Sequence, residues 1–467
     1  MKGNDMCREQ KIPKGSCPGK DRLEAERYLE ARSMPMRDIG RKNGGDLMRR
    51  IVSRENMVQA YKQVRKNGGA PGIDGMTLDG MKLYLSEHYE SLIRSIEDGT
   101  YRPLPVRRVE IPKPDGGVRL LGVPTVIDRM VQQAVAQVLT PIFERTFSEN
   151  SYGFRPGRSA RQAIRKARDL YNEGYRYVVD LDLSKYFDTI NHELLLNMVR
   201  EEVRDKAVIR LIKQFLKSGV MVNGVLVSTE SGSPQGGPLS PLLSNIYLTK
   251  FDKEMEKRGH KFVRCADDVN VYVRSRRSAQ RVLASCKQYL EAKLKLKVNE
   301  KKSEAGSPLK LKFLGFSLRP VKGGKASIRI HEKSIDRFKF KIKCLLRRNQ
   351  GRSIKVVLEK LNLYTRGWLN YYSIADAKSF IRRMNELIGR KIRAYIWKQW
   401  KRVKCRAENL RRYGIHESKA WQWANSRQGI WRMAGAWAMT CSITNKQLEL
   451  LGYDDILRRY NALHSTC

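Results

Sequence analysis

The sequence predicts an α+β protein with a helical C-terminal region, and three observations lead to this fold class. Strand and helix patterns mix irregularly up to about residue 320, rather than in a regular strand–helix repeat. Beyond about residue 330 the strand patterns fade and apolar residues recur at helical spacing. The 467 residues suffice for roughly two to four domains with a substantial core.

The net charge of +44 is the most unusual feature of the composition. Self-repulsion of that size predicts a polyanionic partner, of which nucleic acid is the commonest. No apolar run is long enough to span a bilayer, and the N-terminus lacks the apolar core of a signal peptide. The eight cysteines are scattered without a C-x-x-C pair, which argues against zinc fingers and disulfide frameworks and fits a reducing cytosol. A ribosome-like RNA-coating protein is the alternative, but acidic clusters at defined spacing count against it.

The N-terminal part begins with a basic, weakly periodic tail over residues 1–46. From about Leu47 an amphipathic helix is predicted, which ends at the turn-rich stretch 67–75. Its apolar side comprises Ile51, Met57, Ala60, Tyr61 and Val64. Residues 110–124, EIPKPDGGVRLLGVP, then predict a hairpin that would hold Lys113 and Arg119 near its turn. Such a pair suits a triphosphate, although two basic residues near a turn are usually only solvated.

Two acidic clusters follow. Residues 177–193, YVVDLDLSKYFDTINHE, predict a buried strand with Asp180 and Asp182 on one face, and Asp188 beyond it. Residues 261–273, KFVRCADDVNVYV, predict two short strands joined at Asp267-Asp268. Adjacent carboxylates suit Mg²⁺, and Asp180 or Asp182 could join them about the metal; the pattern leaves open which of the two does so. The alternative for Asp267-Asp268 is an ordinary turn.

Between these clusters, residues 231–248, SGSPQGGPLSPLLSNIYL, place Gln235 in a glycine-rich turn before a helix. Downstream, helices are predicted at about 331–348 and 380–397. Both are strongly basic with interleaved aromatic residues, which favours contact with a nucleic-acid backbone over a merely solvated face.

Eight motifs together resemble the group II intron-encoded reverse transcriptase–maturase family, from about residue 50 to the C-terminus. They are VEIPKPDGGVRLLGVP, SYGFRPGRSARQAI, DLDLSKYFDTINH, SPQGGPLSPLLSNIYL, FVRCADD, LKVNEKKS, LKFLGF and RGWLNYY. The resemblance implies a right-hand polymerase fold. Fingers and palm would occupy 47–325, an α-helical thumb or maturase domain 326–405, and a small DNA-binding segment 406–467. The family's zinc-containing endonuclease domain is expected to be missing, so that insertion would use a nick made elsewhere.

The resemblance also assigns roles to residues. Asp182, Asp267 and Asp268 correspond to the catalytic triad that binds two Mg²⁺ ions. Substrate-binding roles fall on Lys113, Arg119, Phe187, Gln235 and Lys302, with Lys301 an adjacent competitor for the last. Phe187 would be the steric gate against a ribose 2′-hydroxyl, and Leu314 and Gly315 would position the primer end. The implied partners are intron RNA, an RNA template with a DNA primer, dNTPs and target DNA, in a ribonucleoprotein of the bacterial cytoplasm.

The sequence departs from the family at Cys265, where a tyrosine usually precedes Ala-Asp-Asp. We expect a small buried thiol beside the primer site and intact two-metal catalysis, rather than a ligand for a softer metal. Two other functions stay open. One is a splicing-only maturase that binds RNA, and the other is a domesticated reverse transcriptase in repair or defence.

Overall fold

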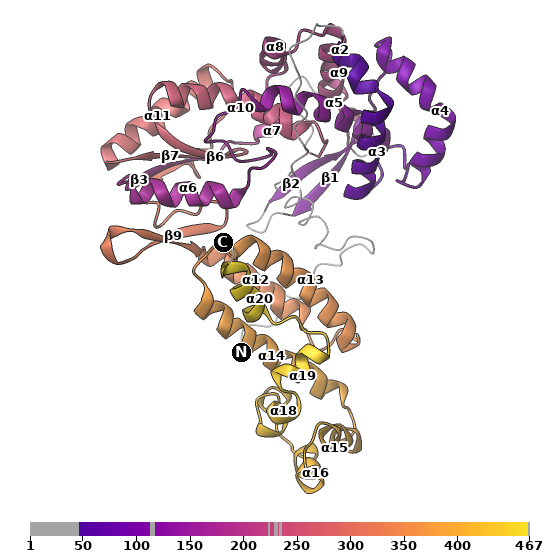
Figure 1. Cartoon of the computed structure of the whole chain (residues 1–467), viewed down its shortest axis with the longest axis vertical. Coiled ribbons are helices and arrows are strands. Elements are labelled where there is room, and N and C mark those ends of the chain that lie inside the picture. The colour runs from indigo at the N-terminus through magenta and orange to yellow at the C-terminus, as the bar shows by residue number, and fades with distance from the viewer. Residues whose placement is uncertain (1–45, 113–116, 223–224, 228–231, 233–235, 466–467) are drawn as a thin grey trace. The chain divides into compact units, whose positions relative to one another are not determined.

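The protein, a computed structural model, is described here for residues 46–112, 117–222, 225–227, 232 and 236–465. These residues divide into two compact units, with the division between Leu311 and Lys312 (Figure 1). Each unit is described by itself. The predicted domain boundary after residue 325 falls within the second unit, between two paired strands.

The first unit begins with a hairpin and a group of helices that pack on one another. The strands β1 (Val106–Pro112) and β2 (Val118–Val123) pair antiparallel, with Ile111 opposite Arg119, which confirms the hairpin predicted at 110–124. The short strands β4 (Val220–Val222) and β5 (Val225–Val227) extend this sheet in the order β2-β1-β4-β5. The helices of this part are α2 (Asp46–Val52), α3 (Arg54–Asn67), α4 (Gly80–Glu97) and α5 (Val126–Glu144).

The prediction of a single helix from Leu47 is wrong in one respect, because the structure has two helices there, α2 and α3. Ser53 lies between them with an extended backbone, and its side chain accepts a hydrogen bond from the Asn56 amide. A serine in that position satisfies one of the free amides at a helix start, which stabilises a new helix there. The predicted apolar side is retained, since Met57, Ala60 and Val64 are buried.

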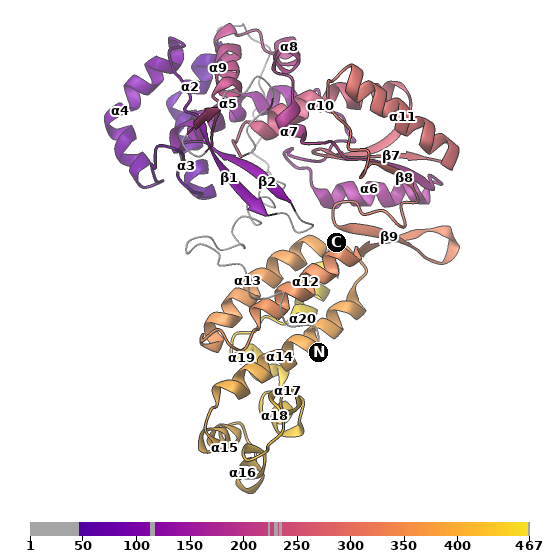
Figure 2. The ribbon, with the colours of Figure 1, turned by 180° about the vertical axis from the view of Figure 1, so that it is seen from behind.

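The rest of the first unit is a four-stranded antiparallel sheet covered by helices. Its order is β6-β7-β3-β8, formed by β6 (Lys261–Cys265), β7 (Asp268–Val273), β3 (Tyr177–Leu181) and β8 (Glu304–Gly306). Helix α11 (Arg276–Ala292) packs on β3, β7 and β8, and α6 (Ala160–Asn172) packs near β6 (Figure 2). The connections from β3 to β6 run through α7 (Tyr186–Thr189), α8 (His192–Glu202), α9 (Lys206–Lys217) and α10 (Ser240–Lys257). One continuous hydrophobic core runs from Met48 to Val298.

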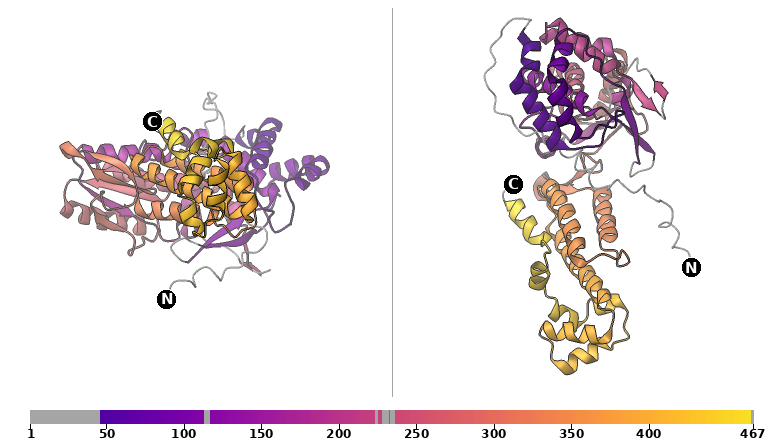
Figure 3. Two further views of the ribbon diagram at one scale, coloured as in Figure 1. Left: turned by 90° about the horizontal axis from the view of Figure 1, so that it is seen from below. Right: turned by 90° about the vertical axis from the view of Figure 1, so that its right-hand side faces the viewer.

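The second unit is a short hairpin followed by helices. Strands β9 (Phe316–Pro320) and β10 (Ala326–Ile330) pair antiparallel, with the short 3₁₀ helix η1 (Lys322–Gly324) between them. Helices α12 (Glu332–Leu345), α13 (Ile354–Tyr372) and α14 (Lys378–Gln399) follow and run alongside one another (Figure 3). The remaining helices are α15 (Val403–Arg412), α16 (Glu417–Ala424), α17 (Ile430–Met433), α18 (Trp437–Ser442), α19 (Asn445–Leu450) and α20 (Ile456–Ser465).

The core of the second unit confirms the helical pattern predicted at about 331–348. Phe338 is fully buried, and its ring centroid lies 4.2 Å from that of Trp368 and 5.8 Å from that of Tyr364. Two residues further along α12, Phe340 is 64% exposed. Among the described residues, no helix combines the length and apolar character that crossing a bilayer requires.

We predict that Phe338→Ala lowers the free energy of unfolding of the second unit by about 3–5 kcal/mol, since it removes a buried ring from an aromatic cluster. Urea unfolding of the full chain, followed by tryptophan fluorescence, measures this loss. The matched control is Phe340→Ala, which removes the same ring from the exposed side and should change stability by about 0.5 kcal/mol or less. Equal losses in the two variants would contradict this description of the core.

Candidate active site

The acidic pair predicted at a hairpin tip lies where the sequence places it. Strands β6 and β7 are joined by the two residues Ala266 and Asp267, with Cys265 paired to Asp268. Ala266 has a φ of 59°, the left-handed region that glycine usually occupies at the first position of such a turn. For alanine this conformation costs about 1–2 kcal/mol, so surrounding contacts must hold the turn.

The strand register brings Asp182 to the same edge of the sheet. Strand β3 runs antiparallel to β7, and its last residue, Leu181, is paired with Val269. One step further along both strands places Asp182 next to Asp268. The structure therefore brings the ends of the two acidic clusters together, as the sequence requires of a site assembled by the fold.

The segment around Lys302 holds Asp182 in place. Asn299 Nδ2 donates a hydrogen bond to Asp182 Oδ2 at 2.9 Å, and Lys302 Nζ lies 3.9 Å from the same oxygen. The backbone amide of Asp182 donates to Ser303 Oγ, and its carbonyl accepts from the amide of Asn299. The LKVNEKKS motif thus orients an acidic residue of the site and offsets its charge.

Asp180 occupies a different environment from Asp182. It is paired with Asn270 across β3 and β7, and the Asn270 amide nitrogen donates to Asp180 Oδ1 at 2.8 Å. Burial, followed by the charges of Asp182 and Glu304, raises the pKa of Asp180 to about 7. Asp182 follows the end of β3 with its side chain 36% exposed. Of the two aspartates, Asp182 is therefore the one placed to meet a ligand at the sheet edge.

The donor chemistry of this edge suits a divalent cation of the Mg²⁺ class, since such ions prefer carboxylate oxygens. Asp182, Asp267 and Asp268 supply those oxygens. Within the described residues, however, no three or more His, Cys, Asp or Glu side chains are gathered closely enough to hold a metal ion. The three aspartates therefore share one edge without forming a compact cluster.

The short helix α7 positions Phe187 after β3. Lys185 precedes it with a φ of 47°, and Tyr186 is buried with its hydroxyl donating to the Ser244 carbonyl at 2.9 Å. The rings of Tyr186 and Phe187 meet edge to face, with centroids 5.1 Å apart. Phe187 is partly buried against the core. The buried neighbour therefore restricts the orientation of the Phe187 ring.

Cys265 is a buried, protonated thiol. Its side chain is 2% exposed, and burial together with the charge of Asp268 raises the pKa of the thiol to about 12. At neutral pH it is therefore a small uncharged group. Since the thiolate is the form of cysteine that binds metals and reacts, this thiol is suited to neither role.

The segment Asn150–Gly153 braces the hairpin, a role that we did not predict for the SYGFRPGRSARQAI motif. The amide of Arg264 donates to the Asn150 carbonyl at 2.9 Å, and the amide of Tyr152 donates to the Arg264 carbonyl at 2.8 Å. A Cβ on Gly153 would lie 2.2 Å from the Ala266 nitrogen. Glycine is thus required there, and this glycine inside a motif was the only signal in the sequence.

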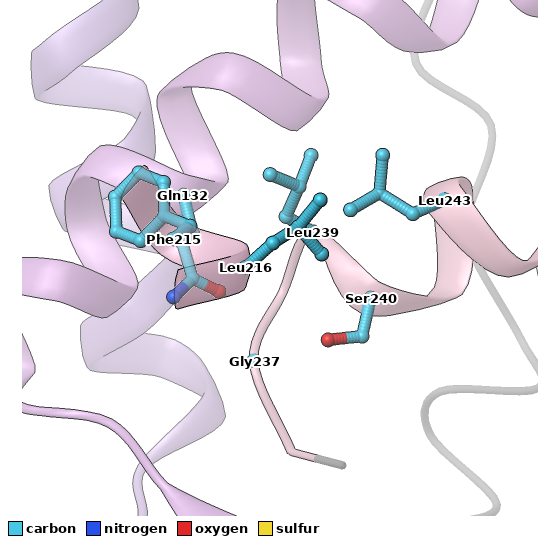
Figure 4. Close-up of a pocket in the computed structure, with 7 residues that line it drawn as sticks. All are labelled: Gln132, Phe215, Leu216, Gly237, Leu239, Ser240 and Leu243. Carbon is cyan, nitrogen blue, oxygen red and sulfur yellow. The ribbon is translucent and has the colours of Figure 1, made fainter. Parts of the chain in front are cut away.

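The glycines after Gln235 allow a close approach, but to other parts of the protein itself. A Cβ on Gly236 would lie 2.4 Å from the Gly122 carbonyl oxygen. A Cβ on Gly237 would lie 2.2 Å from Gln132 Oε1. This contact lies in a small pocket beside the start of α10 (Figure 4). Its lining residues are Gln132, Phe215, Leu216, Gly237, Leu239, Ser240 and Leu243.

Three predicted site residues lie wholly or partly outside the part of the chain that the structure describes. Lys113 and Gln235 lie outside the described residues, and of Arg119 only the backbone in β2 is described. Their roles stay predictions.

Leu314 and Gly315 belong to the second unit and form a turn, with φ values of 50° and 84°. Tyr371 donates its hydroxyl to the Leu314 carbonyl at 2.9 Å, and Ser334 donates to the Gly315 carbonyl at 3.0 Å. A Cβ on Gly315 would lie 2.6 Å from the Tyr372 hydroxyl. The RGWLNYY motif therefore fixes the shape of this turn.

We predict that Asp180→Asn stabilises the protein at pH 8, by about 2 kcal/mol after allowance for partial solvent access. Folding raises the pKa of Asp180 above its value in the unfolded chain. The protonated carboxyl therefore makes its full contribution to stability below that unfolded-chain pKa, and this contribution is lost as the pH rises through about 7. The advantage of the variant should therefore grow between pH 5 and pH 8. Thermal unfolding in EDTA measures it, and a difference that does not vary with pH would contradict the assignment.

Comparisons with known proteins match two segments of the chain. Residues 111–318 match the family described as reverse transcriptase (RNA-dependent DNA polymerase). Residues 335–414 match the maturase-specific domain of group II introns.

Two curated relatives each match part of the chain. Protein YkfC of Escherichia coli (strain K12) is 39% identical over 218 residues, which are 45% of this chain and 57% of that protein. The group II intron-encoded protein LtrA of Lactococcus lactis subsp. cremoris is 40% identical over 208 residues, which are 44% of this chain and 34% of that protein. The matched region thus spans less than two thirds of either relative.

A solved structure, of a partial Cas6-RT-Cas1–Cas2 complex, resembles this one with a TM-score of 0.34 and 22% identity over 56% of this chain and 46% of that chain. This likeness is too distant to add to the assignment. The two domain matches occur in the order predicted by the motifs, and the palm-like sheet and the helical C-terminal region agree with the predicted fold class. The chain therefore carries a reverse transcriptase domain followed by a group II intron maturase-specific domain.

Proposed function

We propose that the protein is an RNA-directed DNA polymerase that also binds its parent intron RNA and assists its splicing and mobility. The observation that carries the proposal is the position of Asp182 and Asp267-Asp268 at one edge of the sheet, inside a reverse transcriptase domain that precedes a maturase domain. Template RNA, a DNA primer and dNTPs are the proposed substrates. The complex with intron RNA is expected in the bacterial cytoplasm.

The proposed chemistry is in-line nucleotidyl transfer at this edge. Asp182, Asp267 and Asp268 would hold two Mg²⁺ ions, whose charge would favour the ionised primer 3′-hydroxyl and the leaving pyrophosphate. Asn299 and Lys302 orient the Asp182 carboxylate. The ammonium of Lys302 is also close enough to this edge to attract a phosphate group.

The other substrate contacts follow from the family resemblance. Lys113 and Arg119 would grip the triphosphate, and Gln235 would line the nucleotide pocket. Phe187 would exclude a ribose 2′-hydroxyl. The edge-to-face contact with Tyr186 supports this role, because it restricts the orientation of the Phe187 ring. Leu314 and Gly315 would position the primer end.

The C-terminal segment supports a further contact with nucleic acid, which we propose includes target DNA. Trp421, Trp431 and Trp437 are 41%, 41% and 52% exposed. The Arg390 guanidinium lies 4.3 Å from the Trp431 ring centroid, and Lys419 Nζ lies 5.4 Å from that of Trp437. Nucleic-acid bases can stack on exposed indole rings, and phosphate groups can form ion pairs with the cations beside them.

Primer extension tests the polymerase. Purified protein with an RNA template, a DNA primer, dNTPs and Mg²⁺ should extend the primer, and Asp267→Ala should reduce extension to background because a metal-binding carboxylate is lost. Asp180→Asn should retain most of the activity. If the wild type fails to extend while still binding intron RNA, the splicing-only maturase is the better description. Rescue of an inactive wild type by Cys265→Tyr would show that the cysteine is not benign.

Equilibrium binding tests the C-terminal segment. We predict that Trp431→Ala and Trp437→Ala each weaken binding of single-stranded DNA by about 1–3 kcal/mol, since each removes a stacking platform. Fluorescence anisotropy at one fixed salt concentration measures the dissociation constants. Leu450→Ala is the control, because Leu450 is 72% exposed on α19 and offers no aromatic face. Equal affinities for all three variants and the wild type would contradict the proposed contact.

A further inference from the structure

The side chain of Arg264 lies fully buried next to the turn that carries Asp267. We propose that Arg264 is a positioning residue for the polymerase reaction: with Asp252 and Asn245, it fixes the peptide group between Ala266 and Asp267 and so sets the direction of the Asp267 carboxylate. This inference rests on the proposed polymerase function and adds to it a residue that never touches substrate.

The guanidinium group joins helix α10 to the hairpin turn. Its Nε lies 2.8 and 2.9 Å from the two carboxylate oxygens of Asp252, and Nη2 lies 2.6 Å from Asp252 Oδ2. On the other side, Nη1 donates to Asn245 Oδ1 at 2.9 Å and to the Ala266 carbonyl at 3.0 Å. Both α10 residues are fully buried and lie two helical turns apart, hence on the same face of the helix.

Asn245 and the backbone of Arg264 extend this network to the bracing segment. Asn245 Nδ2 donates to the Gly153 carbonyl at 2.8 Å, and Gly153 packs directly against the Ala266 nitrogen. The backbone of Arg264 is bonded on both sides to Asn150 and Tyr152. The turn is therefore held from its amide side by Gly153 and from its carbonyl side by Arg264.

Control of the Ala266 carbonyl has a direct effect on Asp267. The peptide bond is planar, so a fixed direction of the Ala266 C=O also fixes the plane that contains the Asp267 nitrogen and Cα. The left-handed backbone of Ala266 is unfavourable by itself. Without the hydrogen bond from Arg264, the turn could relax into another conformation and redirect the carboxylate.

Stability alone does not account for a charged network in this place. The desolvation cost of a buried ion pair can exceed its attraction, and apolar residues of similar volume are often as stable or more so. Lysine would keep the charge but not the flat fork of donors, which here reaches two acceptors on one side and a carboxylate on the other. The arrangement of donors around Arg264 is explained by its hold on the peptide group between Ala266 and Asp267.

Two variants test the proposal in the full chain. Arg264→Lys keeps the positive charge beside Asp252, and the double variant Arg264→Met with Asp252→Leu replaces the ion pair by apolar side chains, of which leucine has the branched shape of aspartate. The control is Tyr101→Phe, which removes another buried hydrogen bond of the first unit, the 2.6 Å contact from Tyr101 to Asp128. Thermal unfolding of each variant reports whether it is folded.

The readout is Mn²⁺ affinity, measured from the free-ion signal in electron paramagnetic resonance, together with kcat and KM for dNTP in primer extension. The binding found with Asp267→Ala is subtracted as background. We expect both Arg264 variants to fold and to bind Mn²⁺ about tenfold or more weakly, the usual loss when a residue that supports a metal ligand is removed. Their kcat should fall with little change in KM, and Tyr101→Phe should change neither affinity nor kcat.

Wild-type Mn²⁺ affinity and kcat in folded Arg264 variants would overturn the proposal. So would failure of both variants to fold, since the network would then serve stability, and so would an equal effect of Tyr101→Phe. Failure of the proposed function looks different, because the wild type itself would then neither extend a primer nor bind Mn²⁺ better than Asp267→Ala.

Discussion

The antiparallel pairing of β3 with β7 is the constraint on which the acidic site depends. Leu181 lies opposite Val269, and this register brings Asp182 next to Asp268 although many residues separate them in the chain. A slip of one residue would turn every side chain of β3 to the other face of the sheet. Val179 and Leu181 lie in the hydrophobic core and oppose such a slip, because it would place a charged neighbour in their positions. The hydrophobic pattern of one strand thus determines which carboxylates can meet.

Asp180 in β3 and Asp182 just after it show how two nearby carboxyl groups can lie in different environments. Asp180 is enclosed by the sheet, beside Asn270 and Glu304, where its charge is disfavoured. Asp182 follows the strand end, where Asn299 and Lys302 stabilise its charge. Two positions of separation are enough to move a carboxylate from the partly buried middle of the strand to the sheet edge. Burial, rather than residue type, distinguishes a structural carboxyl from one that can meet a ligand.

Much of this arrangement could be predicted from the sequence, because it depends on local patterns. Alternating apolar residues located the hairpin at 261–273 and the strand before Asp182, and helical spacing located the burial of Phe338. The break at Ser53 was missed, since the apolar pattern continues through it. The contacts of Arg264 could not be foreseen, because its partners come from α10 and from residues 150–153, which only the complete fold brings together.

Gly153 has a consequence for how segments of related proteins can be exchanged. Any side chain at this position would collide with the backbone of the hairpin turn, so neither segment can shift or enlarge unless the other adjusts with it. A hairpin transplanted from a related protein would therefore require its own version of residues 150–153, because the two segments form one interlocking module. Chimeras should be cut around this module rather than at the ends of the hairpin.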